Sequence, residues 1–242
     1  MKKKSSWIIT LILICSLHLS CNTDEEAIIN PNTIVLDSYK KQYQKIAQNN
    51  TNPYDTIGRI QNYILDIYLS ANHNHSTIEE INEEIQTIVN TYGNSFIGNS
   101  VQQSLTVGNQ IINPFNTTES SLSTIIANSQ LTNQAKVSLS GFITSLFLLV
   151  EEEYEDIHDF VVSYELSVIN NSEFNDEDKR IILTTSSLSR YSFYYEKKRK
   201  DKDWETSVGN IMAGLSGALE NSLTAVNSAL VTGIYHNTIV TD

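Results

Sequence analysis

Apolar residues recur at helical spacing along most of the chain, and this pattern constrains the fold more than any other feature. The clearest case follows Ser76-Thr77-Ile78-Glu79, a capping box in which the Ser and Glu side chains satisfy backbone N–H groups at a helix start. Five branched apolar residues then share one helix face: Ile78, Ile81, Ile85, Ile88 and Val89. This pattern predicts a helix that stops at Gly93.

The same periodicity predicts further helices over residues 35–46, 55–70, 118–128, 132–150, 151–168, 176–199 and 204–235. Residues 93–117 are more often interrupted by Gly and Pro, and we expect one short helix there, at 101–105. The chain has only 3 Pro and 9 Gly in 242 residues, which favours helices over a sandwich or barrel. The expected fold is an all-α bundle of about seven or eight helices, forming a single domain over residues 35–242.

The first 21 residues have the organisation of a bacterial secretory leader. Lys2, Lys3 and Lys4 form a positive segment, and residues 7–19 form an apolar stretch too short for a good membrane span. Ser20 and Cys21 follow, and the segment resembles a lipobox, although His18 stands where an aliphatic residue is usual. The resemblance implies removal of residues 1–20 and a lipid on Cys21, which would anchor the protein to a membrane through its acyl chains. Cleavage nearby by ordinary signal peptidase, giving a secreted protein, is the alternative.

Residues 21–34 contain Pro31 and lack helical periodicity, so we expect a flexible acidic tether. Asp24, Glu25 and Glu26 resemble the surface-export signal of Bacteroidetes lipoproteins, which implies an outer-membrane lipoprotein that faces the cell exterior. A solvated acidic tether is the alternative interpretation, and it would leave the periplasmic face open.

The charge and cysteine content exclude several functions. Loss of the three leader lysines changes the formal net charge from −12 to −15, which disfavours nucleic-acid binding. Cys15 would leave with the leader, and Cys21 would carry the lipid, so we expect neither an intrachain disulfide nor a thiol nucleophile. The sequence also lacks a Gly-rich phosphate loop, a Gly-x-Ser-x-Gly elbow and a His-Glu-x-x-His motif, and we therefore expect no enzymatic activity and no cofactor.

Two groups of residues have spacings that metal ligands use. Glu155 and His158 fit Glu-x-x-His, which places both side chains on one helix face, but ferritin-like di-iron bundles need two such motifs. His73 and His75 could chelate a metal from a loop, but no further ligand adjoins them in the sequence. A solvated acidic face and a surface loop are the favoured interpretations, so no metal site is assigned.

The segment 204–235 carries a regular row of small residues, here called the small-residue stripe: Gly209, Ala213, Gly217, Ala225, Ala229 and Gly233. Small residues four apart let another helix approach closely. We favour a central helix of the bundle. The alternative is a helix that inserts into a membrane or self-associates, against which Glu220, Asn221 and Asn227 argue because each polar group would need a partner in lipid.

The stretch 180–195, followed by Trp204 and the small-residue stripe, resembles the C-terminal half of a group of uncharacterised Bacteroidetes proteins. The resemblance covers residues 175–235 and implies a common architecture, without an activity. Within it, Arg190 with Tyr191, Tyr194 and Tyr195 could bind a polar ligand, or the Tyr rings could line the bundle.

The sequence as a whole predicts a cell-surface lipoprotein that binds a ligand or partner, or serves a structural role, without catalysis. A membrane-active or self-associating protein that uses residues 204–235 is the alternative, and a bundle enzyme with a metal comes third.

Overall fold

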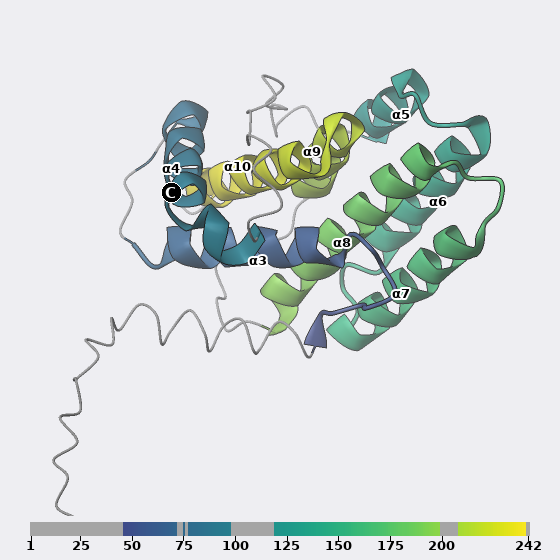
Figure 1. The fold of residues 1–242 in the computed structure, drawn as a ribbon, viewed down its shortest axis with the longest axis horizontal. Helices are drawn as coiled ribbons and strands as arrows, with labels where there is room; N and C mark the ends of the chain where they lie inside the picture. Colours follow the sequence, from purple (N-terminus) through teal and green to yellow (C-terminus); the bar gives the residue numbers. More distant parts are fainter. Residues whose placement is uncertain (1–45, 72–74, 76, 98–118, 199–207, 241–242) are drawn as a thin grey trace, which may run out of the picture. The chain divides into compact units, whose positions relative to one another are not determined.

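The computed structural model describes residues 46–71, 75, 77–97, 119–198 and 208–240, all within the unit Tyr39–Asp242 (Figure 1). This part of the chain contains eight helices and no strand, which confirms the predicted all-α bundle. The helices are α3 (Asp55–Leu69), α4 (Ile78–Ile97), α5 (Glu119–Asn128), α6 (Asn133–Leu148), α7 (Tyr154–Asn170), α8 (Asp176–Lys198), α9 (Val208–Glu220) and α10 (Ser222–Val240). Cys21, most of the helix predicted at 35–46, the short helix predicted at 101–105 and Trp204 lie outside the described residues.

The predicted boundaries of α4 are wrong at both ends. The capping box lies one residue later than expected: the Glu80 backbone N–H donates to Thr77 Oγ1, and the Thr77 N–H donates to the Glu80 carboxylate, each at 3.2 Å. Two consecutive Ser/Thr residues and two consecutive Glu residues make either register compatible with the motif. The helix also continues past Gly93 to Ile97, because a helix-interior Gly costs only about 1 kcal/mol relative to Ala.

The helix predicted over 204–235 is not continuous. It breaks at Asn221, which separates α9 from α10 and caps the start of α10: its Oδ1 accepts from the N–H groups of Leu223 at 3.0 Å and Thr224 at 2.9 Å. Asn is a preferred N-cap because its side-chain oxygen satisfies backbone donors that a helix start leaves unpaired.

At this break the chain folds back, so that α9 and α10 form an antiparallel hairpin (yellow in Figure 1). A Cβ atom added to Gly217 would lie 2.6 Å from Ala225 Cα, and one added to Gly214 would lie 3.5 Å from the Cβ of Ala229. In one straight helix these pairs would lie more than about 10 Å apart along the axis. The small residues therefore bring the two helices of the hairpin into contact.

Helix α8 is the centre of the bundle, with contacts to α3, α6, α7, α9 and α10. All residues from 181 to 195 are buried, although many are polar: Thr184, Thr185, Ser186, Ser187, Ser189, Arg190 and Ser192. Several hydroxyls donate to carbonyls of their own helix, as Thr185 does to Ile181 and Ser189 does to Thr185, each at 2.9 Å. Hydroxyls satisfied in this way can be enclosed without a large desolvation penalty.

Helices α3 and α8 approach closely at Gly58, a buried residue of α3. Its N–H donates to Ser187 Oγ at 3.2 Å, and the same hydroxyl donates to the backbone carbonyl of Asp55. A Cβ atom at Gly58 would lie 2.4 Å from Tyr191 Cδ2 and 2.6 Å from the Ser187 carbonyl oxygen. Only Gly fits at this crossing with the helices at their present separation.

Candidate functional site

Three charged side chains form a buried cluster around Arg190. Its side chain is fully buried, and Nη2 donates to Asp55 Oδ1 at 2.7 Å and to Glu165 Oε1 at 3.3 Å. These residues come from α8, α3 and α7, so the cluster connects three helices. The guanidinium also lies 5.2 Å from the ring centroid of Tyr191, within range of a cation–π contact.

Neutral groups donate further hydrogen bonds to both carboxylates of the cluster. Glu165 accepts from the side-chain amides of Asn49 at 2.6 Å and Asn52 at 2.8 Å. It also accepts from Ser186 Oγ at 3.0 Å. Asp55 accepts from the Asn49 backbone N–H at 3.0 Å and from the Tyr191 hydroxyl at 3.1 Å. The segment that precedes α3 is thereby fixed to the same cluster.

The surroundings favour the charged guanidinium. Burial by itself disfavours the charge, but the neighbouring carboxylates of Glu165 and Asp55 outweigh it and raise the pKa of Arg190 above its usual value. The pKa of Tyr191 is also raised, mainly by burial and further by the negative charge of Asp55. The phenol therefore stays protonated and donates a hydrogen bond to Asp55. The cluster therefore links α3, α7 and α8, and its charged groups contact one another within the fold.

The sequence indicated Arg190 and its Tyr neighbours as either a ligand site or a lining of the bundle, and the structure has all four side chains buried. The ion-pair partners of Arg190, Asp55 and Glu165, were not identified from the sequence. Glu165 shares a helix face with the apolar residues Ile157, Val161 and Val168, and this position could have indicated it, whereas the buried residues of α3 include polar side chains besides Asp55.

Glu155, His158 and His75, the described residues with metal-ligand spacing, do not come together in a site. Glu155 is exposed and pairs with Lys198, 2.9 Å away, and this contact lowers the pKa of Glu155. His158 lies beside Asp159 at 3.4 Å, and His75 Nδ1 is 3.2 Å from the hydroxyl of Tyr68. Residue 73 is outside the described residues. Among those that are described, no three His, Cys, Asp or Glu side chains are placed to hold one metal ion.

The small-residue stripe lies inside the protein. All six of its residues are buried, and the hairpin packs against α8, with α10 also contacting α3 and α4. Between α10 and α4, Asn227 donates to Asn82 Oδ1 at 3.0 Å and accepts from Gln86 Nε2 at 3.1 Å. In the part of the chain that is described, no helix is both long enough and apolar enough to cross a membrane.

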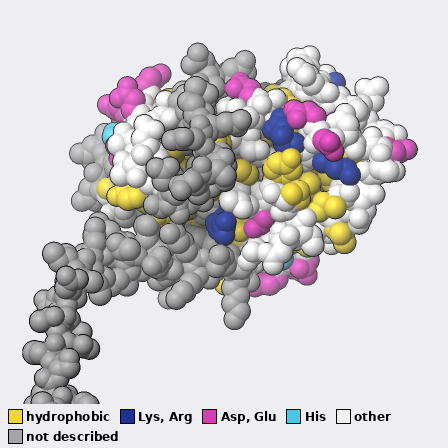
Figure 2. All heavy atoms as spheres, in the orientation of Figure 1, with side chains coloured by type: hydrophobic (Ala, Val, Ile, Leu, Met, Phe, Trp, Pro, Cys, Tyr) yellow, Lys and Arg dark blue, Asp and Glu magenta, His cyan; other side chains and the backbone are white. Residues whose placement is uncertain are grey.

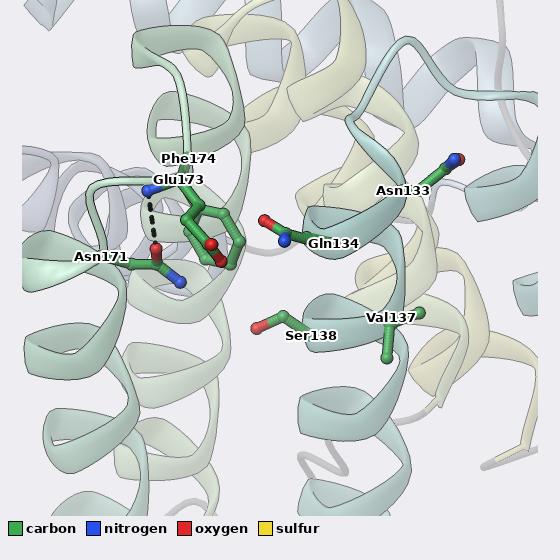
Figure 3. A pocket seen from close by; sticks show the side chains of 7 residues that line it. All are labelled: Asn133, Gln134, Val137, Ser138, Asn171, Glu173 and Phe174. Atoms are coloured by element: carbon green, nitrogen blue, oxygen red, sulfur yellow. Dashed lines mark hydrogen bonds between the residues drawn. The ribbon is translucent and has the colours of Figure 1, made fainter.

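An open groove of about 460 Å³ lies between the start of α6 and the turn that joins α7 to α8 (Figure 3). Its lining residues are Asn133, Gln134, Val137, Ser138, Asn171, Glu173 and Phe174. Asp178, which is buried, fixes the geometry of the two walls. It accepts from both the N–H and the hydroxyl of Thr132, the N-cap of α6, and its own N–H donates to Asn175 Oδ1 at the start of α8.

The groove offers amide and hydroxyl groups and one carboxylate, that of Glu173, beside apolar surface. Figure 3 shows Gln134 and Ser138 pointing from α6 toward Phe174 on the opposite wall. Asn171 uses its Oδ1 to accept from the Glu173 N–H at 2.8 Å, which leaves its amide N–H groups for other partners. Amides both donate and accept, and the lining contains no Lys, Arg or His. This chemistry suits a small neutral ligand with hydroxyl or amide groups better than an anion.

On the face shown in Figure 2, Asp and Glu side chains lie mainly near the margins, and hydrophobic side chains gather between Lys and Arg side chains. The chain matches no protein-family model, no curated protein and no solved structure, so the fold and the groove are the basis on which its function can be inferred.

Proposed function

We propose that this protein is a non-catalytic binding lipoprotein, anchored through Cys21 to the outer membrane and displaying its helical bundle at the cell surface. The main support for the anchoring is the leader sequence, in which a positive segment and a short apolar stretch are followed by Ser20 and Cys21. The acidic residues 24–26 support the outward orientation, because they follow Cys21 as in exported lipoproteins.

Two features of the bundle support binding rather than catalysis. The charged groups Arg190, Asp55 and Glu165 are buried and bonded to one another, so they connect helices. The groove beside α6, by contrast, is open to solvent and lined mainly by amide, hydroxyl and apolar groups, with one carboxylate, which can hold a ligand by hydrogen bonds and contact area. We assign ligand binding to this groove.

The alternative of membrane insertion through residues 204–235 receives less support. The small residues of α9 and α10 are already in contact within the hairpin, and exposing them to lipid would require the hairpin to separate from α8.

Metabolic labelling with an alkyne fatty acid tests the anchor and orientation in cells that express the full chain. The proposal predicts a labelled protein, loss of label in Cys21→Ser, and digestion by protease added to intact cells. Replacing Asp24, Glu25 and Glu26 by Ala should retain the label and prevent digestion. Label that persists in Cys21→Ser excludes this lipid site, and a labelled protein that protease cannot reach contradicts surface display.

Saturation-transfer NMR of the mature protein tests the groove. The probes are a neutral glucose oligosaccharide, a neutral tripeptide and ADP as an anionic comparison. We expect a neutral probe to give a signal that Gln134→Ala reduces and Asn90→Ala, an exposed amide change on α4, leaves unchanged. A stronger signal from ADP, or equal effects of the two substitutions, would exclude the groove as the binding site.

A further inference from the structure

Helix α6 has an exposed face that the other described helices do not cover. Five residues at heptad spacing form this outer face of α6: Gln134, Val137, Gly141, Thr144 and Leu148. Val137 is 75% exposed and Leu148 is 79% exposed, the two highest values among the large exposed hydrophobic residues of the described chain. Spacing of three and four residues is the pattern of a helix that packs along a second helix.

A glycine lies at the middle of this face. A Cβ atom added to Gly141 would meet nothing within 4 Å, so no contact within the described bundle requires Gly there. In a helix interior Gly costs about 1 kcal/mol relative to Ala, and a close approach by another helix is one physical reason for it.

The charges at the two ends of α6 indicate the direction of a partner helix. The outer face itself carries no charge, and α6 has only one charged residue, Lys136, near its start. Three exposed acidic residues, Glu151, Glu152 and Glu153, follow its C-terminal end. An antiparallel copy of α6 would place these acids beside Lys136 of the other molecule and would align the two helix dipoles favourably.

We propose that the outer face of α6 is a self-association surface on which a second copy of this chain packs its own α6 antiparallel, about a two-fold axis. Val137 of each copy lies opposite Leu148 of the other, and Gly141 lies opposite Thr144 at the closest approach. The interface is then self-complementary, as a two-fold contact must be. Elsewhere the net negative charge makes two copies repel each other, whereas this face is neutral.

The contact is expected to be weak in solution. One pair of helices of this length buries less than the roughly 1,000 Å² of a stable interface. Confinement of both copies to one membrane by lipid anchors raises their effective concentration and favours the pair. Gln134 and Val137 belong both to this face and to the lining of the groove, so pairing would cover part of the groove, whereas Leu148 lies outside the lining.

Disulfide trapping in membranes tests the pairing. Full-length Val137→Cys and Leu148→Cys proteins, with tags of different size, are mixed and oxidised. Cβ atoms must approach closely for a disulfide, so we expect mixed dimers to form at least about tenfold faster than Val137→Cys dimers. The matched control is Asn90→Cys on α4, which should trap at background rate with either variant.

Sedimentation of the mature lipoprotein in detergent micelles gives a second measurement. Leu148→Lys should shift the protein toward monomer without weakening probe binding in the groove, because the side chain is exposed and lies outside the lining. Equal trapping of like and mixed pairs, trapping no faster than the Asn90→Cys control, or an unchanged sedimentation profile would each overturn the proposed surface.

Discussion

Replacement of Arg190 by Met examines whether the buried cluster holds the bundle together. Met has a similar reach but no charge, so the substitution removes the guanidinium and leaves much of the packing volume filled. Asp55 keeps the Tyr191 hydroxyl and the Asn49 N–H as donors, and Glu165 keeps Asn49, Asn52 and Ser186. Both carboxylates would nevertheless stay buried without a cation.

Removing one partner of a buried ion pair typically costs about 3–5 kcal/mol, because the remaining charge is left uncompensated. Single domains have only about 5–15 kcal/mol of stability in total, so the loss would be a large fraction. In urea it corresponds to a decrease of about 1–2 M in the unfolding midpoint.

The assay is urea unfolding of the unlipidated Cys21→Ser protein at pH 7, followed by circular dichroism. The matched control on the same helix is Arg180→Met, which breaks a partly exposed pair with Glu177 and should cost less than about 1 kcal/mol. The triple change Asp55→Asn, Glu165→Gln and Arg190→Met should be more stable than Arg190→Met alone. If Arg190→Met costs no more than the Arg180 control, the cluster does not stabilise the bundle.

Three further predictions concern close contacts and one buried acid. Gly58→Ala should destabilise by about 1–3 kcal/mol in urea unfolding, despite the higher helix propensity of Ala, because its Cβ would overlap Tyr191; unchanged stability would contradict this. Gly217→Ala should destabilise similarly by forcing the α9–α10 hairpin apart, whereas Gly141→Ala, with open space, should stabilise by up to about 1 kcal/mol. Burial raises the pKa of Asp66 to about 8, although a hydrogen bond from the Tyr195 hydroxyl acts in the opposite direction. Its stabilising contribution is complete below about pH 4, the ordinary range of an unfolded Asp, and is lost as the pH rises through 8, by at most about 1.4 kcal/mol per pH unit. Unfolding midpoints between pH 4 and 8 should therefore fall less in Asp66→Asn than in the parent, and parallel pH profiles would contradict the assignment.

The sequence predicted most helices because apolar residues on one face must be buried. Residues 55–70, 118–128 and 176–199 correspond closely to α3, α5 and α8. The predicted start of the helix after α6 was early: residues 151–153 precede α7, which begins at Tyr154. Acidic residues favour the first turn of a helix and also the segment before it, so periodicity alone does not fix that start.

The hairpin at Asn221 was not predicted, because no helix-breaking residue marks it and its sequence signal is a symmetric arrangement of small residues. Helical spacing continues across residue 221 without a Gly or Pro, so periodicity indicated one helix. The small residues are nevertheless arranged symmetrically about Asn221, four, eight and twelve positions on either side. An N-cap residue at the centre of such a row permits the chain to fold back with small residues facing each other.

The central position of α8 could not be predicted from its composition. Its Ser, Thr and Arg residues are typical of an exposed or half-exposed helix, and burial depends on partners far away in the sequence. Gln61 Nε2, for example, donates to Ser192 Oγ at 2.9 Å, and Asn62 Nδ2 donates to the Tyr191 carbonyl at the same distance. Such pairings between α3 and α8 depend on the tertiary fold, which local patterns do not specify. The groove was missed for the same reason, since its two walls are separated by the whole of α7.

The proposed surface lipoprotein depends most directly on the chemistry of Cys21. Mass spectrometry of the N-terminal peptide, from mature protein extracted from membranes, measures both the cleavage position and the modification. We predict that the mature chain begins at Cys21 and that this residue carries a thioether-linked diacylglycerol and an N-acyl chain. An N-terminal peptide that begins elsewhere, or an unmodified Cys21 at the mature N-terminus, would contradict the proposal.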